Sequence, residues 1–156
     1  MKIIALDPGT TQSAFVVWDG DLIIAKGIEK NEVLNSRLRD WGGLMFPMVI
    51  EQIRCYGMPI GQTTLDTVFW SGRFWESWKG DRHLMPRLEV KKHLCHNGSA
   101  KDSNIRQALI DRFGPPGTKK EPGLLYGVKK DIWAAMAVAV TWMENYDLQD
   151  HTFISD

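Results

Sequence analysis

The chain has 156 residues, 44% of them hydrophobic, and its 19 Lys and Arg are balanced by 19 Asp and Glu. This length fits one domain with a substantial core, and the neutral balance argues against a nucleic-acid partner unless the charges are segregated along the chain. No apolar run approaches the roughly 18 residues that span a bilayer, and the N-terminus lacks a signal-peptide pattern, so we expect a cytoplasmic protein without membrane contact. The two cysteines, Cys55 and Cys95, form no metal or redox motif.

The first predicted strand, residues 3–6, is a short unbroken apolar run, which is typical of a strand buried on both faces. It ends at Asp7, and Pro8 and Gly9 then turn the chain sharply. A carboxylate at the tip of a buried strand is unfavourable unless a positive charge meets it, so Asp7 is a candidate functional residue facing a cleft. The alternative is a plain tight turn, which Asp-Pro-Gly forms in many proteins.

The next two strands are predicted at residues 14–18 and 22–25, because Asp-Gly between two β-rich runs is a strong hairpin signal. The chain therefore opens with three antiparallel strands, and residues 30–43 leave room for one short helix. A fourth strand, residues 46–53, carries Glu51 inside an otherwise apolar run. Glu51 is either a functional carboxylate or a residue of an edge strand that turns it to water.

Residues 62–79 predict a helix that is apolar on two sides. One face has the spacing of an amphipathic helix: Leu65, Val68, Phe69, Gly72 and Trp75. The second is an aromatic stripe of Trp70, Phe74 and Trp78. We expect one face to lie on the sheet, while the aromatic stripe fits either core packing or a contact with a second subunit.

Positive charge is concentrated in residues 79–101, which the overall neutrality conceals. The basic residues there are Lys79, Arg82, Arg87, Lys91, Lys92 and Lys101. They form either a nucleic-acid-binding patch or a solvated face. The following helix has a predicted core face of Ile105, Ala108, Leu109 and Phe113.

A long loop, residues 114–127, is rich in Pro and Gly and carries Lys119 and Lys120; loops of this length are usually functional or mobile. The last helix has Asp131 in its first turn, where the helix dipole favours an anion, and helix capping alone would also explain this residue. Its alanines allow close approach to a sheet. We assign residues 1–146 to one domain and residues 147–156 to an acidic, frayed C-terminal tail.

Five blocks in order across residues 2–142 resemble those of a known family. ALDPGTTQSAF is similar to an apolar strand that ends in Asp-Pro-Gly, and VIEQI to apolar residues leading into Glu-Gln. The Trp70–Ser71–Gly72–Arg73 stretch, VKKHLCHNGSAKDSNIRQAL and KKDIWAAMAVAV are similar to the later blocks. The family is that of the RuvC Holliday-junction resolvases in the RNase H-like superfamily, and the short spacing before Glu51 resembles its phage-type members.

The resemblance implies an α/β, RNase H-like fold with a mixed five-stranded sheet flanked by helices. It implies that Asp7, Glu51 and Asp131 are catalytic acids that bind Mg²⁺ or Mn²⁺, with two ions in each active site. It implies a homodimer, which we expect to form through Trp70, Phe74 and Trp78. The expected DNA-binding residues are Arg73, Lys91, Lys92, Lys101, Lys119 and Lys120.

The sequence departs from the family in three places. The family usually has a second acid three residues after the position of Asp131, and this chain has Ala134 there, which leaves one metal site short of a ligand. Arg54 stands where many members have an aromatic residue, and Lys101 lies one place before the family's lysine. The long helix before the strand of Glu51 is nearly absent.

The expected function is a metal-dependent endonuclease that resolves four-way or other branched DNA in recombination, repair or phage DNA processing, without a small-molecule cofactor. One alternative is a junction-binding protein whose active site has decayed at Ala134. The other is an actin-like phosphate-binding domain, because residues 7–11 also resemble the phosphate loop of that class. That class needs a second domain, for which 156 residues leave no room.

Overall fold

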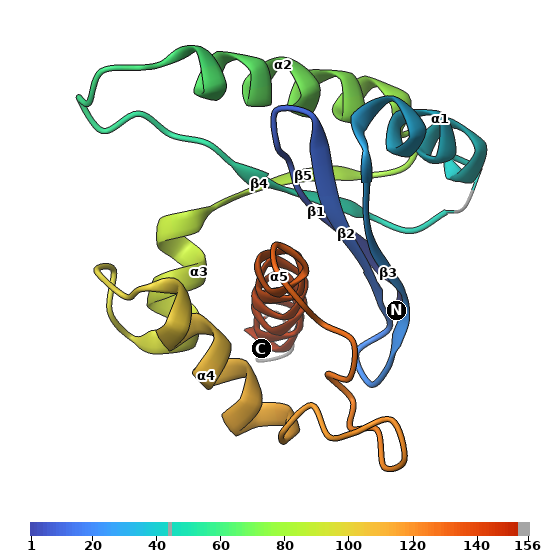
Figure 1. The fold of residues 1–156 in the computed structure, drawn as a ribbon, viewed down its shortest axis with the longest axis vertical. Coiled ribbons are helices and arrows are strands. Elements are labelled where there is room, and N and C mark those ends of the chain that lie inside the picture. Colours follow the sequence, from blue (N-terminus) through green and yellow to red (C-terminus); the bar gives the residue numbers. More distant parts are fainter. Residues whose placement is uncertain (44, 153–156) are drawn as a thin grey trace.

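A computed structural model describes residues 1–43 and 45–152 of the protein, with side chains described up to residue 146. The described part contains a five-stranded sheet and five helices (Figure 1). In chain order the elements are β1 (Ile3–Asp7), β2 (Gln12–Trp18), β3 (Ile23–Lys30), α1 (Asn31–Trp41), β4 (Met48–Gln52), α2 (Gln62–Ser77), β5 (Arg82–Pro86), α3 (Arg87–Cys95), α4 (Asp102–Phe113) and α5 (Ile132–Thr152).

The strand order in the sheet is β3-β2-β1-β4-β5. The first three strands pair antiparallel, whereas β4 pairs parallel to β1, and β5 pairs parallel to β4. The β2–β3 turn forms where Asp-Gly predicts it, because the Asp19 carboxylate accepts hydrogen bonds from the N–H groups of Asp21 (2.9 Å) and Leu22 (2.7 Å). This is the RNase H-like sheet that the sequence predicts.

Strand β4 is an interior strand, since it lies between β1 and β5. Glu51 is 8% exposed. The edge-strand interpretation of Glu51 is therefore wrong, and its carboxylate is a buried charge that needs an explanation.

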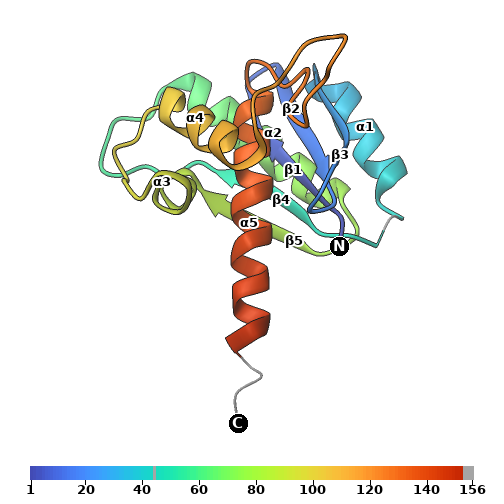
Figure 2. The same cartoon turned by 90° about the horizontal axis from the view of Figure 1, so that it is seen from below.

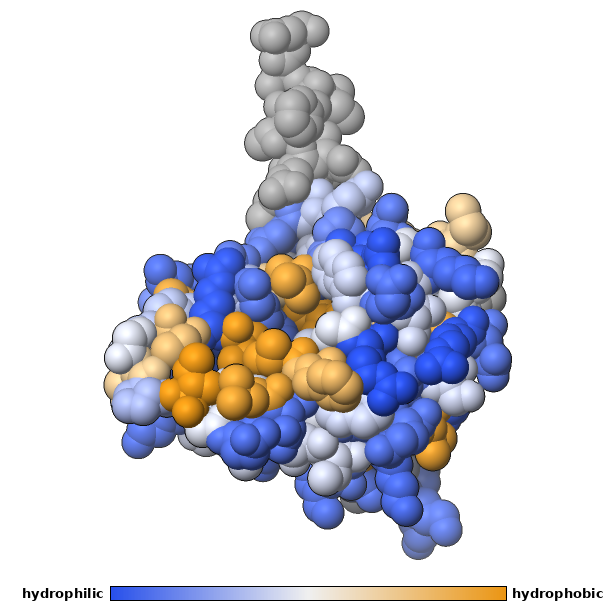
Figure 3. Space-filling view, turned by 90° about the horizontal axis from the view of Figure 1, so that it is seen from above, coloured by the Kyte–Doolittle hydropathy of each residue, from blue (hydrophilic) through white to orange (hydrophobic). Residues whose placement is uncertain are grey.

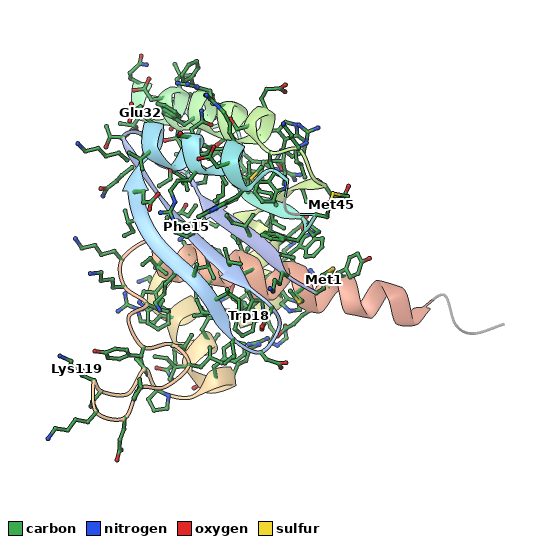
Figure 4. All side chains as sticks on the ribbon, turned by 90° about the vertical axis from the view of Figure 1, so that its right-hand side faces the viewer. Met1, Phe15, Trp18, Glu32, Met45 and Lys119 are labelled. Carbon is green, nitrogen blue, oxygen red and sulfur yellow. The ribbon has the colours of Figure 1, made fainter. Side chains whose placement is uncertain are left out.

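Helices cover both faces of the sheet (Figures 1 and 2). Helices α1 and α2 lie on one face, and α5 crosses the other with α3 and α4 beside it. Alternation along the strands divides the core accordingly, as Figure 4 shows for Phe15 and Trp18, which point to opposite sides of β2. Ala135 and Ala139 of α5 are fully buried, which allows the close approach to the sheet that the sequence predicts.

The aromatic stripe of α2 is part of the core of its own subunit. Trp70, Phe74 and Trp78 pack with Ile4 and Leu6 beneath the helix, and Phe74 has no exposed surface. The prediction that places these three side chains at a subunit interface is therefore wrong. Periodicity identified two apolar faces of α2 but not which of them meets the sheet.

The other face of α2 points outward and is apolar. Leu65, Val68 and Phe69 are 53%, 49% and 62% exposed, and Met58 and Ile60 of the preceding loop are also exposed. Figure 3 looks down on α2 and shows hydrophobic residues gathered on this side of the molecule. We call Leu65, Val68 and Phe69 the outer α2 face.

Helix α5 extends past the sheet (Figure 2) and continues to Thr152, six residues beyond the predicted domain boundary at residue 146. The rest of the predicted tail, residues 153–156, lies outside the described residues. Among the helices that the structure describes, none combines the length and the apolar character needed to cross a membrane.

Candidate active site

The pairing of β1 and β4 brings two of the predicted acids together. The strands run parallel with Leu6 opposite Ile50, so Asp7 and Glu51 follow side by side. Ala5 and Val49, two residues earlier on each strand, face the α5 side of the sheet. Because side chains alternate along a strand, the carboxylates of Asp7 and Glu51 face α5 as well.

The third acid is supplied by the start of α5. Lys130 has a left-handed backbone, with φ of 47°, and turns the chain towards the helix. The carbonyl of Asp131 accepts the N–H of Ala135 at 3.1 Å, which places Asp131 at the N-terminal end of α5. Its side chain is exposed.

The three acids line one cavity of about 250 Å³. Its other charged lining residues are Arg87, Asp102, Arg106 and Lys130. Ala134 also lines it, one turn along α5 from Asp131, where the resemblance predicts a missing acid. The structure therefore gathers all three predicted acids around one space.

The turn after Asp7 is fixed by two polar residues that sequence reasoning did not single out. The Gly9 N–H donates to Ser13 Oγ (3.0 Å), Ser13 Oγ donates to Asn31 Oδ1 (2.6 Å), and Asn31 Nδ2 donates back to the Gly9 carbonyl (2.9 Å). A Cβ at Gly9 would lie 2.2 Å from the carbonyl oxygen of Gln12. Glycine is therefore required in the turn that holds Asp7.

Burial and the neighbouring carboxylates disfavour a negative charge on Asp7. Burial is the largest cause and, together with the charges of Glu51 and Asp131, raises the pKa of Asp7 from 3.8 to about 9, while Arg87 acts in the opposite direction. In addition, Glu51 Oε2 is buried without a hydrogen-bond partner in the described structure. A divalent cation bound here would replace the proton of Asp7 and give the unpaired Glu51 oxygen a positive partner.

The donor set fits a hard divalent cation, because all three side chains offer carboxylate oxygens. Asp7, Glu51 and Asp131 are the residues that would hold it. In the described part of the chain, no three His, Cys, Asp or Glu side chains already stand close enough together to hold an ion. The Asp131 side chain is exposed, and Arg87 engages one oxygen of Glu51.

Arg87 is the main cavity residue that sequence reasoning missed, since it counted only as one of several basic residues. It follows β5 directly, and β5 pairs with β4 so that Pro86 lies opposite Gln52. Arg87 Nη1 donates to Glu51 Oε1 at 3.0 Å, and Nη2 pairs with Asp102. The signal that could have found it is its place at the end of the third parallel strand.

None of the six predicted DNA-binding side chains lines the cavity. Lys91 and Lys92 lie on α3, and Lys101 directly precedes α4. Lys119 and Lys120 lie in the 114–127 loop, and Figure 4 shows Lys119 pointing away from the body of the molecule.

Arg73 is the sixth of them, and it belongs to the other layer of the molecule. It lies on α2 with its guanidinium carbon 4.4 Å from the Trp70 ring centroid. It also lines a separate groove with Asn35, Arg39 and Lys79. The DNA-binding role of all six residues stays a prediction.

The chain matches no protein-family model and no curated protein sequence. Among solved structures it is similar to RuvC from Thermus thermophilus, with a TM-score of 0.70 and 14% identity over 96% of this chain and 97% of that one. It is also similar to T. thermophilus RuvC in complex with a Holliday junction substrate, with a TM-score of 0.65 and 14% identity over 90% and 92% of the two chains. The protein therefore has the RuvC-like, RNase H-like fold that its sequence blocks predict.

Proposed function

We propose that this protein is a divalent-metal-dependent endonuclease that cuts branched DNA such as four-way junctions. The observation that carries the proposal is the convergence of Asp7, Glu51 and Asp131 from three separate elements on one cavity. The fold adds support, because a similar structure is RuvC in complex with a Holliday junction substrate. A buried acid with a strongly raised pKa, such as Asp7, beside further acids in a cavity is typical of a functional site.

The chemistry is phosphodiester hydrolysis. A pair of Mg²⁺ or Mn²⁺ ions, when bound, would supply an activated water and neutralise the leaving oxygen. Asp7 and Glu51 hold the acidic centre in place because each is fixed by strand pairing, and Asp131 closes it from α5. Arg106 and Lys130 on the cavity wall provide positive charge for the scissile phosphate.

DNA outside the cavity would follow the basic residues. Lys91, Lys92 and Lys101 lie on or next to α3 and α4, the helices whose residues also line the cavity. Lys119 and Lys120 extend this positive charge along the loop that leads to α5. Arg73, on the other layer, would contact a second arm of a branched substrate. Such contacts to phosphates would make binding depend strongly on salt.

A homodimer would place two such cavities on one branched substrate, and a two-fold axis would match the two strands cut in a four-way junction. The outer α2 face is our candidate for the subunit contact, because it is apolar, exposed and continuous with the exposed apolar residues of the preceding loop. Val68→Glu should leave the fold intact and shift a dimer to monomers in analytical ultracentrifugation. A variant that remains dimeric would remove this face from the interface.

Nicking of an end-labelled four-way junction with Mg²⁺ or Mn²⁺ tests the proposal, with a linear duplex of the same sequence and an EDTA reaction as controls. We expect metal-dependent cuts in the junction and few or none in the duplex. Flap and fork substrates in the same assay would define the range of branched DNA.

A second candidate function is favoured by Ala134, which lines the cavity where the family usually has an acid. In that case the protein binds junctions without cutting them. A gel-shift of the junction together with no nicking at any concentration of either metal would support this candidate over the endonuclease.

A further inference from the structure

Arg87 divides its guanidinium between a buried and an exposed carboxylate. Nη1 donates to Glu51 Oε1 at 3.0 Å, and Nη2 pairs with Asp102. The Asp102 side chain is 82% exposed and that of Arg87 is 39% exposed. An ion pair this exposed is weak, so Glu51 is the partner that holds the guanidinium in the cavity.

The two oxygens of Glu51 differ in their surroundings. Oε1 accepts from Arg87, whereas Oε2 is buried and has no hydrogen-bond partner among the described residues. A cation that uses Glu51 as a ligand therefore meets a fixed positive charge already bound to the same carboxylate. The cation and the Arg87 guanidinium would then share one carboxylate, so the two positive charges repel each other. The repulsion is stronger because Glu51 is buried.

A phosphate that enters the cavity offers the guanidinium an alternative partner. Arg87 lines the same cavity as Asp7 and Asp131, and a guanidinium fork binds phosphate oxygens as well as it binds a carboxylate. The long, half-exposed side chain can turn towards such a phosphate without moving α3. Its departure would leave Glu51 free.

We propose that Arg87 competes with the metal for Glu51 and is drawn away by a DNA phosphate, so that metal and DNA bind cooperatively. This inference rests on the proposed nuclease function. It makes Arg87 a residue that couples two ligands, in addition to any contact with the substrate. By linkage, the factor by which DNA tightens metal binding equals the factor by which metal tightens DNA binding.

The chain offers a charge-matched control in Arg106. It lines the same cavity, and in the described structure it stacks over Trp133 at 5.2 Å without an ion pair. Arg106→Gln therefore removes one positive charge from the cavity and releases no carboxylate. Arg87→Lys keeps the charge but loses the fork that spans Glu51 and Asp102.

The test is Mn²⁺ binding, followed by the electron paramagnetic resonance signal of free Mn²⁺, with and without a four-way junction that is checked for nicks afterwards. Without DNA, we expect Arg87→Gln to bind Mn²⁺ several-fold more tightly than the wild type. Arg106→Gln should show a smaller increase in Mn²⁺ affinity, and the affinity of Arg87→Lys should lie between those of the wild type and Arg87→Gln. We also expect the junction to tighten Mn²⁺ binding by a smaller factor in Arg87→Gln than in the wild type. Melting curves check that each variant is folded. If Arg87→Gln does not fold, Arg87→Lys is compared with the wild type instead.

Two results would overturn the inference alone, provided that the wild type binds Mn²⁺ and cuts the junction. Weaker Mn²⁺ binding by Arg87→Gln would mean that Arg87 orients Glu51 for the metal instead of competing with it. If Arg87→Gln and Arg106→Gln tighten Mn²⁺ binding equally, the effect comes from the loss of one positive charge in the cavity and not from the release of Glu51. A wild type that binds no Mn²⁺, even with the junction, would overturn both the inference and the proposed function.

Discussion

The two faces of the sheet are built from the same strands but differ in what they bury. The α1–α2 face buries an aromatic and aliphatic core around Phe74, and α2 exposes further apolar residues outward. The α5 face buries carboxylates at the strand ends and leaves a cavity beside them. One face thus provides stability and exposes an apolar surface, and the other holds a cluster of carboxylates. Strain concentrated at one edge of an otherwise well-packed sheet is typical of a catalytic site.

The largest effect that separates the two faces should come from Asp7→Asn. We expect nicking of a four-way junction to fall by orders of magnitude, because a ligand is lost from the centre of the acid cluster, while junction binding persists or tightens as repulsion of the phosphates falls. Nicking rates and gel shifts measure the two quantities. Asp21→Asn, which removes an exposed acid in the β2–β3 turn, is the control. Cutting by Asp7→Asn at the wild-type rate would rule out this site.

The opposite face should respond in stability. Phe74→Ala removes a fully buried ring and should lower the free energy of unfolding by about 3–5 kcal/mol. Phe69→Ala, five residues earlier on the same helix and 62% exposed, should cost less than about 1 kcal/mol. Urea unfolding at a concentration where both proteins are monomers compares them. Equal losses would mean that α2 packs on the sheet by a different face.

The pH dependence of stability should belong to the cavity face. Because the pKa of Asp7 is raised from 3.8 to about 9, the folded metal-free protein holds a proton that the unfolded chain releases. Stability through this group should therefore fall as the pH rises from about 4 towards 9, and the loss should be complete above that range. In EDTA, the melting temperature of Asp7→Asn relative to that of the wild type should rise as the pH increases from 5 to 8. A constant difference would contradict the raised pKa.

The smallest predicted effect concerns Ala134. An acid at this position would face the cavity one turn from Asp131 and supply a further oxygen ligand. We expect the wild type to need millimolar-scale Mg²⁺ or to prefer Mn²⁺, since Mg²⁺ demands near-octahedral oxygen ligands. Ala134→Asp should lower the metal concentration for half-maximal nicking several-fold. Identical metal curves for both proteins would mean that another residue already serves as that ligand.

Asp7 and Glu51 stand out in the sequence because each breaks a strong local pattern, whereas helix capping alone would explain Asp131 until the family resemblance groups the three acids. Asp7 and Glu51 interrupt apolar strands, and Asp131 stands at the start of an alanine-rich helix. The three antiparallel strands that open the sheet were also predictable, from the hairpin signal, whereas the sequence did not locate the fifth strand, Arg82–Pro86. These features depend on local sequence, which periodicity describes well.

The remaining parts depend on which surfaces meet in three dimensions. Helix α2 is apolar on two sides, so its sequence fits either orientation on the sheet. The prediction placed the aromatic stripe outward, but the outer face is the one with Leu65, Val68 and Phe69. Arg87 is one of several basic residues in its segment, and only strand pairing places it beside Glu51. Ser13 and Asn31 are ordinary polar residues until β2 and α1 bring them together.

The hydrogen bonds around Gly9 have a consequence for the time scale of motion in the active site. Turns at strand ends usually open by local fluctuations, and their amides exchange with solvent rapidly. Here both backbone groups of Gly9 are held, the N–H by Ser13 on β2 and the carbonyl by Asn31 at the start of α1. Opening this turn requires Gly9 to break both hydrogen bonds, one to each element. The Gly9 amide should thus exchange more slowly than the amides of ordinary turns at strand ends, and the turn would hold the carboxylate of Asp7 in place for correspondingly long periods.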